Sequence, residues 1–161
     1  MFRTLDILYD GSDQILGRGT RVWRAQRVDS GVLIGDPVAL KDSWVDDHRE
    51  REGDIDIRIR QSALLLDDED RERLVNSLLT VVCHGDVVIE GCRDHTRPIP
   101  TDRAPRRISK IPLHHPGSRI PPSPSLQTHY RIAFQEVGKP LRDETSLGDI
   151  FKAIVDVCAG K

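Results

Sequence analysis

The fold is decided by the stretch Ile15-Leu16-Gly17-Arg18-Gly19-Thr20-Arg21-Val22-Trp23-Arg24-Ala25 and, a little further on, by Val38-Ala39-Leu40-Lys41. A glycine-bearing turn leads into a Val-x-x-Ala segment, and a lysine closes an apolar strand about 16 residues beyond that alanine. Gly-x-Gly alone occurs in many hairpin turns, and an apolar run that ends in lysine is commonly a strand end with a snorkelling side chain. The two together, in this order and spacing, are much less common than either alone.

The bulk composition is that of a single water-soluble domain. The chain has 161 residues, of which 37% are hydrophobic and 31% charged, and its formal net charge is −2. This charge gives no reason to expect a nucleic acid or an anionic membrane as partner. No apolar run approaches the roughly 20 residues of a membrane helix, and Met1-Phe2-Arg3-Thr4 lacks the apolar core of a signal peptide. Three scattered cysteines indicate a reducing compartment, so we expect an intracellular protein of the cytoplasm or nucleus.

The first third of the chain is typical of strands that give way to a charged helix. Strands are predicted between Asp13 and Ser43, separated by glycine and aspartate turn signals, at 14–16, 21–27, 32–34 and 37–42. The segment 54–60 alternates with a period of two, which favours a strand. However, Ile55, Ile59 and Ala63 share one helical face and no turn residue interrupts 54–67, so we favour a helix.

The later elements are clearer. Residues 68–80 open with acidic side chains and then carry an apolar stripe, which predicts a helix. Strands are predicted at 81–89, with a bulge at Gly85-Asp86, and at 130–137. A final helix is predicted from Ser146 to Ala159, capped by Thr145 or Ser146 and stopped by Gly160. We expect it to bury Leu147, Ile150, Phe151, Ile154 and Cys158.

A segment rich in proline and arginine lies between these parts, at about 92–128. Its prolines exclude a central strand or a helix interior, so we expect an exposed, poorly ordered insertion. The alternative is that its arginines dock an acidic partner or a nucleic acid. The prolines and basic residues concerned are Pro98, Pro100, Pro105, Pro112, Pro116, Pro121, Pro122 and Pro124, with Arg93, Arg97, Arg103, Arg106, Arg107, Lys110 and Arg119.

Taken together, the motifs resemble the fungal-type protein kinase family. The more specific matches are Lys41-Asp42-Ser43-Trp44 and Val137-Gly138-Lys139-Pro140-Leu141. The full set covers most of residues 10–161 and consists of Gly17–Trp23, Ala39–Trp44, Arg51–Ile55, Asp94–Thr96, Tyr130–Leu141 and Asp156–Gly160.

The resemblance implies an α+β fold: a kinase-like small lobe, made of an antiparallel sheet and one main helix, followed by the first helix of the large lobe. It implies an N-terminal extension at 1–12, the small lobe at 13–137 with the insertion inside it, and the hinge exit and start of the large lobe at 138–161. The family's His-Arg-Asp and Asp-Phe-Gly motifs would follow the helix that ends near Gly160, whereas the sequence stops at Lys161. We therefore expect an amino-terminal fragment that lacks the Mg²⁺ ligands and the rest of the large lobe, and is inactive alone.

The implied activity is transfer of the ATP γ-phosphate to serine or threonine hydroxyls of a protein that the sequence does not identify. The alternative is a non-catalytic, pseudokinase-like interaction module. In either case the apolar face of the last helix would lie uncovered, which predicts poor solubility or association.

The resemblance also implies roles for individual residues. Lys41 would bridge the α- and β-phosphates and Glu52 would pair with it, Glu50 being the competitor. The turn that covers the phosphates would consist of Gly17, Gly19 and Thr20. This turn is degenerate, because the first and third kinase glycines fall on Ile15 and Thr20, and a plain hairpin turn is its alternative. The adenine pocket would take small apolar contacts from Val22 and Ala39, the bulky Phe134 behind it, and backbone groups of Glu136 and Val137 at the hinge.

Two other motifs are rejected. A zinc site built from Cys83, His84, Cys92 and His95 would match no common ligand spacing. The segment His84-Gly85-Asp86 is similar to the catalytic motif of small-molecule phosphotransferases, but the asparagine expected about five residues later is replaced by Gly91. We expect no metal site in the chain.

Overall fold

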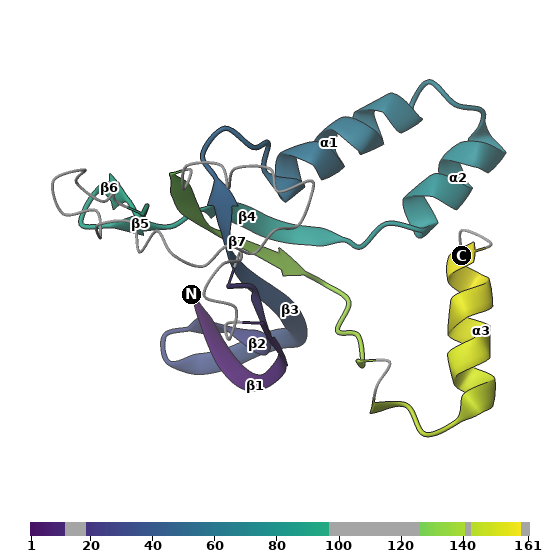
Figure 1. The fold of residues 1–161 in the computed structure, drawn as a ribbon, viewed down its shortest axis with the longest axis horizontal. Coiled ribbons are helices and arrows are strands. Elements are labelled where there is room, and N and C mark those ends of the chain that lie inside the picture. The colour runs from purple at the N-terminus through teal and green to yellow at the C-terminus, as the bar shows by residue number, and fades with distance from the viewer. Residues whose placement is uncertain (12–18, 97–125, 141–142, 159–161) are drawn as a thin grey trace, which may run out of the picture.

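The computed structural model describes residues 1–11, 19–96, 126–140 and 143–158 and has an α+β fold, as expected (Figure 1). The predicted strand at 14–16 and nearly all of the proline- and arginine-rich insertion lie outside these residues. The elements in chain order are β1 (Phe2–Asp10), β2 (Arg21–Asp29), β3 (Val32–Asp46), α1 (Glu52–Ala63), α2 (Asp68–Asn76), β4 (Val81–Asp86), β5 (Val88–Ile89), β6 (Cys92–Arg93), β7 (Gln127–Phe134) and α3 (Leu147–Cys158).

A five-stranded antiparallel sheet forms the centre of the fold, with the strand order β1-β2-β3-β7-β4. The strand β3 is 15 residues long and lies in the middle, where it pairs with β2 on one side and β7 on the other. It joins the two strands predicted at 32–34 and 37–42 into one. The short strands β5 and β6 form a separate hairpin.

The first strand corrects the sequence analysis. We expected residues 1–12 to be an N-terminal extension, whereas β1 is the edge strand of the main sheet, in register from Phe2 opposite Arg27 to Asp10 opposite Arg21. Two register shifts, at Thr4/Asp6 and at Ile7/Tyr9, interrupt the pairing. Such irregularities break the alternation of apolar and polar side chains by which a half-buried strand is recognised in a sequence.

The sheet buries side chains on both of its faces, because successive residues of a strand point to opposite sides. One face carries a cluster of Ala39, Val45, Tyr130, Ile132 and Phe134. The other carries the smaller cluster of Ala25, Val38 and Ala133.

The helix predicted in the charged segment is confirmed. Helix α1 has Ala63 buried and Ile55 and Ile59 half-buried, so the helical period correctly identified its inner face. Helix α2 begins where predicted but ends at Asn76 rather than at Thr80. Its start is fixed by Asp67, whose side chain accepts a hydrogen bond from the Asp70 N–H at 2.9 Å.

The last helix forms where predicted, and its apolar face lies uncovered as the resemblance implied, so the burial expected from its apolar stripe is not observed. The Ser146 hydroxyl oxygen accepts a hydrogen bond from the Asp149 N–H at 3.3 Å, which makes Ser146 the cap. Leu147, Phe151 and Ile154 are 71%, 65% and 46% exposed, because α3 follows an extended segment and stands apart from the sheet (Figure 1). None of the helices in the described ranges is long and apolar enough to span a membrane.

A polar cluster joins three segments that are distant in the sequence. It lies on the outer face of the sheet, which is the face turned away from α1. The ring of His129 on β7 is hydrogen-bonded through one nitrogen to Asp94 at 2.8 Å and through the other to Asp42 on β3. The indole of Trp44 stacks on this ring, with centroids 4.8 Å apart, and Arg131 lies 3.5 Å from Asp42. All three members of the Asp42-His129-Asp94 bridge are mostly buried, so the bridge ties β3, β7 and the segment after β6 together.

We predict that His129→Ala destabilises the fold by about 2 kcal/mol, because it removes two charge-assisted hydrogen bonds and leaves two carboxylates without their shared partner. The free energy of unfolding is measured by urea titration. His48→Ala serves as the control, because His48 is exposed. Equal effects of the two substitutions would contradict the role of the bridge.

Candidate functional site

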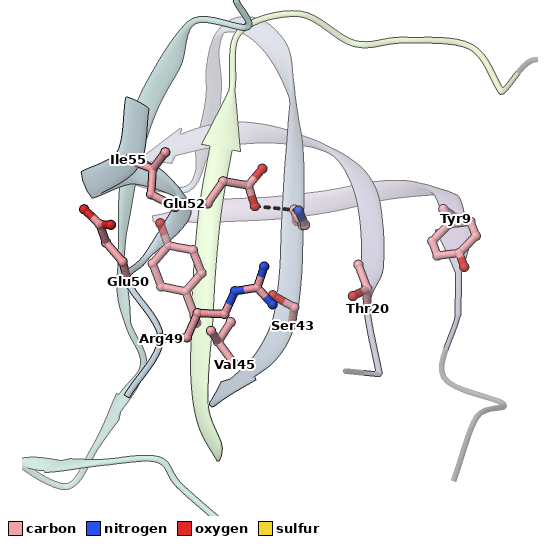
Figure 2. A pocket seen from close by; sticks show the side chains of 10 residues that line it. Tyr9, Thr20, Ser43, Val45, Arg49, Glu50, Glu52 and Ile55 are labelled. Carbon is pink, nitrogen blue, oxygen red and sulfur yellow. Dashed lines mark hydrogen bonds and ion pairs between the residues drawn. The ribbon is translucent and has the colours of Figure 1, made fainter. Parts of the chain in front are cut away.

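An ion pair between the sheet and α1 stands at the centre of the candidate site. Lys41 lies on β3 between Val22 of β2 and Ile132 of β7, and its Nζ is 2.5 Å from Oε2 of Glu52, the first residue of α1 (Figure 2). Glu50, the competing candidate, instead pairs with Arg58 at 2.9 Å. The structure therefore brings Lys41 together with Glu52 and not with Glu50.

The position of Glu52 depends on the residue that follows it. Gly53 is buried against β4, and a Cβ atom at this position would lie 2.2 Å from the ring of His84, which is far inside the contact distance. The Gly53 N–H donates a hydrogen bond of 2.9 Å to the hydroxyl of Tyr130 on β7, so one free amide of the first helical turn is satisfied by the sheet. The missing side chain thus lets α1 approach the sheet closely enough for Glu52 to reach Lys41.

A second contact holds the start of α1 from the other side. Nε of Arg51 donates to Asp86 at 2.7 Å, and its Nη2 lies 3.4 Å from the second carboxylate oxygen. Both side chains are mostly buried, at 12% and 18% exposure. The hydrogen bond that it donates to Asp86 raises the pKa of the Arg51 guanidinium above its ordinary value, against the opposing effect of desolvation. His84 and Asp86 belong to the rejected phosphotransferase-like motif, and both serve to seat α1.

An apolar cavity of about 620 Å³ opens next to the ion pair. Of the residues that the sequence suggested for the site, it brings together Val22, Ala39, Lys41, Glu52, Phe134 and Glu136. The other lining residues were not predicted from the sequence; they are Leu8, Tyr9, Leu79, Gly138, Lys139 and Pro140. Leu8 and Tyr9 were missed because β1 was not recognised: Leu5 and Ile7 flank Asp6, but the apolar Leu8 follows Ile7 directly and interrupts the alternation.

A second cavity, of about 470 Å³, also borders this ion pair (Figure 2). It shares Tyr9, Lys41 and Glu52 with the apolar cavity, so the two compartments adjoin at Lys41. Its other lining residues are Thr20, Ser43, Val45, Arg49, Glu50, Ile55 and Tyr130.

Three predicted residues lie elsewhere. Gly17 is outside the described residues. Gly19 has a φ of +50° and faces Trp44, and it lines neither cavity. Val137 lines a shallower hollow of about 490 Å³ together with Gln135 and Pro140.

The segment after β7 is fixed to the start of β4. The Gln135 N–H donates to the Thr80 carbonyl at 2.9 Å, and the Thr80 N–H donates to the Glu136 carboxylate at 2.8 Å. Desolvation would raise the pKa of Glu136, but the hydrogen bonds from Thr80 outweigh it and hold this pKa below its ordinary value. The side chain of Glu136 therefore anchors the segment, while the segment forms one wall of the apolar cavity.

Chemically, the arrangement suits a ligand with a flat apolar part and an anionic tail. The apolar cavity would bind the flat apolar part, and the ammonium group of Lys41 at its inner end would pair with the anionic tail. Among the described residues, no group of three histidine, cysteine, aspartate or glutamate side chains is arranged to hold a metal ion.

The family model described as fungal protein kinase matches residues 4–161, which is nearly the whole chain. No curated protein and no solved structure matches the chain.

We predict that Gly53→Ala destabilises the chain by about 2 kcal/mol, because the new methyl group forces α1 and the His84 ring apart. Gly85→Ala is the matched control, since a Cβ at Gly85 meets no atom within 4 Å. In a double-mutant cycle, His84→Ala should recover much of the loss caused by Gly53→Ala. Urea titration gives the free energies, and additive effects in the cycle would contradict the proposed steric contact.

We also predict a loss of stability at alkaline pH that depends on Tyr130. Burial raises the pKa of Tyr130 to about 12, whereas a tyrosine in the unfolded chain ionises near 10. Between these values the unfolded state releases its proton first, so stability falls as pH rises from about 10 to about 12. An ultraviolet absorbance titration should show a late phenolate step that Tyr130→Phe removes and Tyr9→Phe leaves in place. A titration without that late step would contradict the burial of this hydroxyl.

Proposed function

The chain belongs to the fungal protein kinase family, and on this premise we propose that it binds ATP at the junction of the two cavities beside Lys41. The bound nucleotide would serve phosphorylation of protein serine and threonine hydroxyls, the activity that the family resemblance implies. The observation that carries the proposal is the Lys41–Glu52 ion pair at 2.5 Å, which stands where the apolar cavity ends.

In this proposal, Lys41 bridges the α- and β-phosphates and Glu52 keeps its ammonium group in place. Both side chains are partly exposed, so a phosphate can reach the ammonium group without a rearrangement of the helix. Glu52 thus positions the ammonium group of Lys41, and α1 determines the position of Glu52.

The adenine ring would occupy the apolar cavity. Val22 and Ala39 are small enough to leave room for a flat ring, and Phe134 closes the cavity where β7 ends. Backbone groups of the segment from Gln135 to Val137 would meet the polar edge of the adenine. Thr80 and Glu136 hold this segment through the hydrogen bonds described above, which supports its role as a fixed wall.

Within the kinase family, transfer of the γ-phosphate also requires a His-Arg-Asp-type loop and an Asp-Phe-Gly-type metal site. Neither motif occurs in the 161 residues of this sequence. We therefore assign these residues the binding and orientation of ATP, as a kinase small lobe. A non-catalytic interaction module is the second candidate, favoured by the exposed apolar side chains of α3.

We predict that ATP without added Mg²⁺ raises the thermal midpoint of the chain, and that Lys41→Met weakens ATP binding at least tenfold by removing the phosphate partner. Binding is measured by thermal shift over a range of ATP concentrations, because a ligand that binds only the folded state stabilises it by mass action. Lys152→Met on α3 is the control, since Lys152 is exposed. If ATP fails to shift the unmutated chain, the nucleotide site is wrong and the interaction module takes its place.

A further inference from the structure

Arg49 is a cation that the site described so far does not use. It lies in the loop between β3 and α1 and lines the 470 Å³ cavity. Figure 2 shows its guanidinium group turned toward Ser43, below the dashed line from Glu52, whereas the carboxylate of Glu50 points the opposite way. Within the described part of the chain, no carboxylate lies within ion-pair distance of this guanidinium.

The two carboxylates of the same cavity are already occupied. Glu52 pairs with Lys41 at 2.5 Å, and Glu50 pairs with Arg58 at 2.9 Å. The charge of Arg49 is therefore not balanced by either of them. An unpaired cation that faces a cavity is a site at which an anion gains charge-assisted hydrogen bonds.

The other polar groups of the cavity are also suited to an anion. Tyr9, Thr20 and Ser43 line it, and the hydroxyl group that each carries can donate a hydrogen bond. Ser43 is buried at 4% exposure, two residues after Lys41 on the same face of β3. The cavity thus combines an ammonium group, a guanidinium group and three hydroxyls.

We propose that Arg49 binds the terminal phosphates of the nucleotide whose base occupies the apolar cavity; this rests on the proposed function. The two cavities share Tyr9, Lys41 and Glu52, so a ligand that reaches Lys41 from the apolar side continues into the compartment of Arg49. The planar guanidinium matches two phosphate oxygens at once. Ile15 and Thr20 occupy the positions of two glycines of the family motif, and Arg49 supplies phosphate contacts in addition to those of that motif.

The test compares ligands that differ only in their phosphates. Adenosine, ADP and ATP are titrated by calorimetry into the full chain and into Arg49→Gln, without Mg²⁺. Arg49→Gln should weaken ATP binding roughly tenfold and leave the affinity for adenosine unchanged. This loss is near the lower end for a charge-assisted hydrogen bond, because the site is open to solvent. Arg73→Gln is the matched control, because Arg73 is an exposed arginine of α2 that pairs with Glu69. Arg49→Lys should keep part of the ATP affinity.

The outcomes separate this inference from the function on which it rests. If the unmutated chain binds neither adenosine nor ATP, the proposed nucleotide site fails and the role of Arg49 fails with it. If the chain binds ATP more tightly than adenosine and Arg49→Gln leaves that ratio unchanged, Arg49 is a solvated surface residue and the nucleotide site stands. Arg49 is exposed, so its substitution should not unfold the chain, and the thermal midpoint without ligand verifies this.

Discussion

The close approach of α1 to the sheet at Gly53 is the contact on which the candidate site depends. A helix normally stands off from a sheet by the size of the side chains between them, but here the ring of His84 occupies the place where a Cβ would be. The hydroxyl of Tyr130 then reaches the Gly53 N–H at 2.9 Å. Glu52 precedes Gly53 by one residue. The packing of the Gly53 backbone against the His84 ring therefore places the Glu52 carboxylate next to Lys41.

The packing of α1 on the sheet positions the ion pair of Lys41 and Glu52; the ion pair does not position the helix. Lys41 and Glu52 are 28% and 47% exposed, and partly exposed pairs of this kind contribute only about 0–1 kcal/mol. Such a pair is too weak to hold a helix of 12 residues in place. The pair of Arg51 with Asp86 is mostly buried, and the loss of one partner would leave an uncompensated charge in the interior. The charged site therefore results from the contacts that Gly53 and Arg51 make with their partners on β4 and β7, which fix the start of α1 on the sheet.

Local patterns in the sequence predicted much of the site but not what supports it. The helical period identified the inner face of α1, and the family resemblance led to Lys41, Glu52 and about half of the residues that line the apolar cavity. The contacts that fix α1 on the sheet join residues up to 77 positions apart. The sequence around Gly53 does not indicate that it contacts Tyr130, and the sequence around Tyr130 does not indicate that it contacts Gly53. The strand β1 was missed because its bulges break the alternation. The apolar stripe of α3 predicted burial, whereas the family resemblance predicted an uncovered face. The face is uncovered, because burial requires a partner surface, which a helix's own sequence does not supply.

The segment Lys41-Asp42-Ser43-Trp44 shows how one strand serves both faces of the sheet. Lys41 and Ser43 face the cavities, whereas Asp42 and Trp44 face the opposite side and bind His129. A slip of one residue between β3 and β7 would exchange these faces, placing the aspartate in the site and the lysine outside it. The bridge of Asp42, His129 and Asp94 opposes such a slip, because the stacked pair of Trp44 and His129 exists only in the observed register. The outer face, which contributes no group to the cavities, thereby fixes which groups the inner face presents.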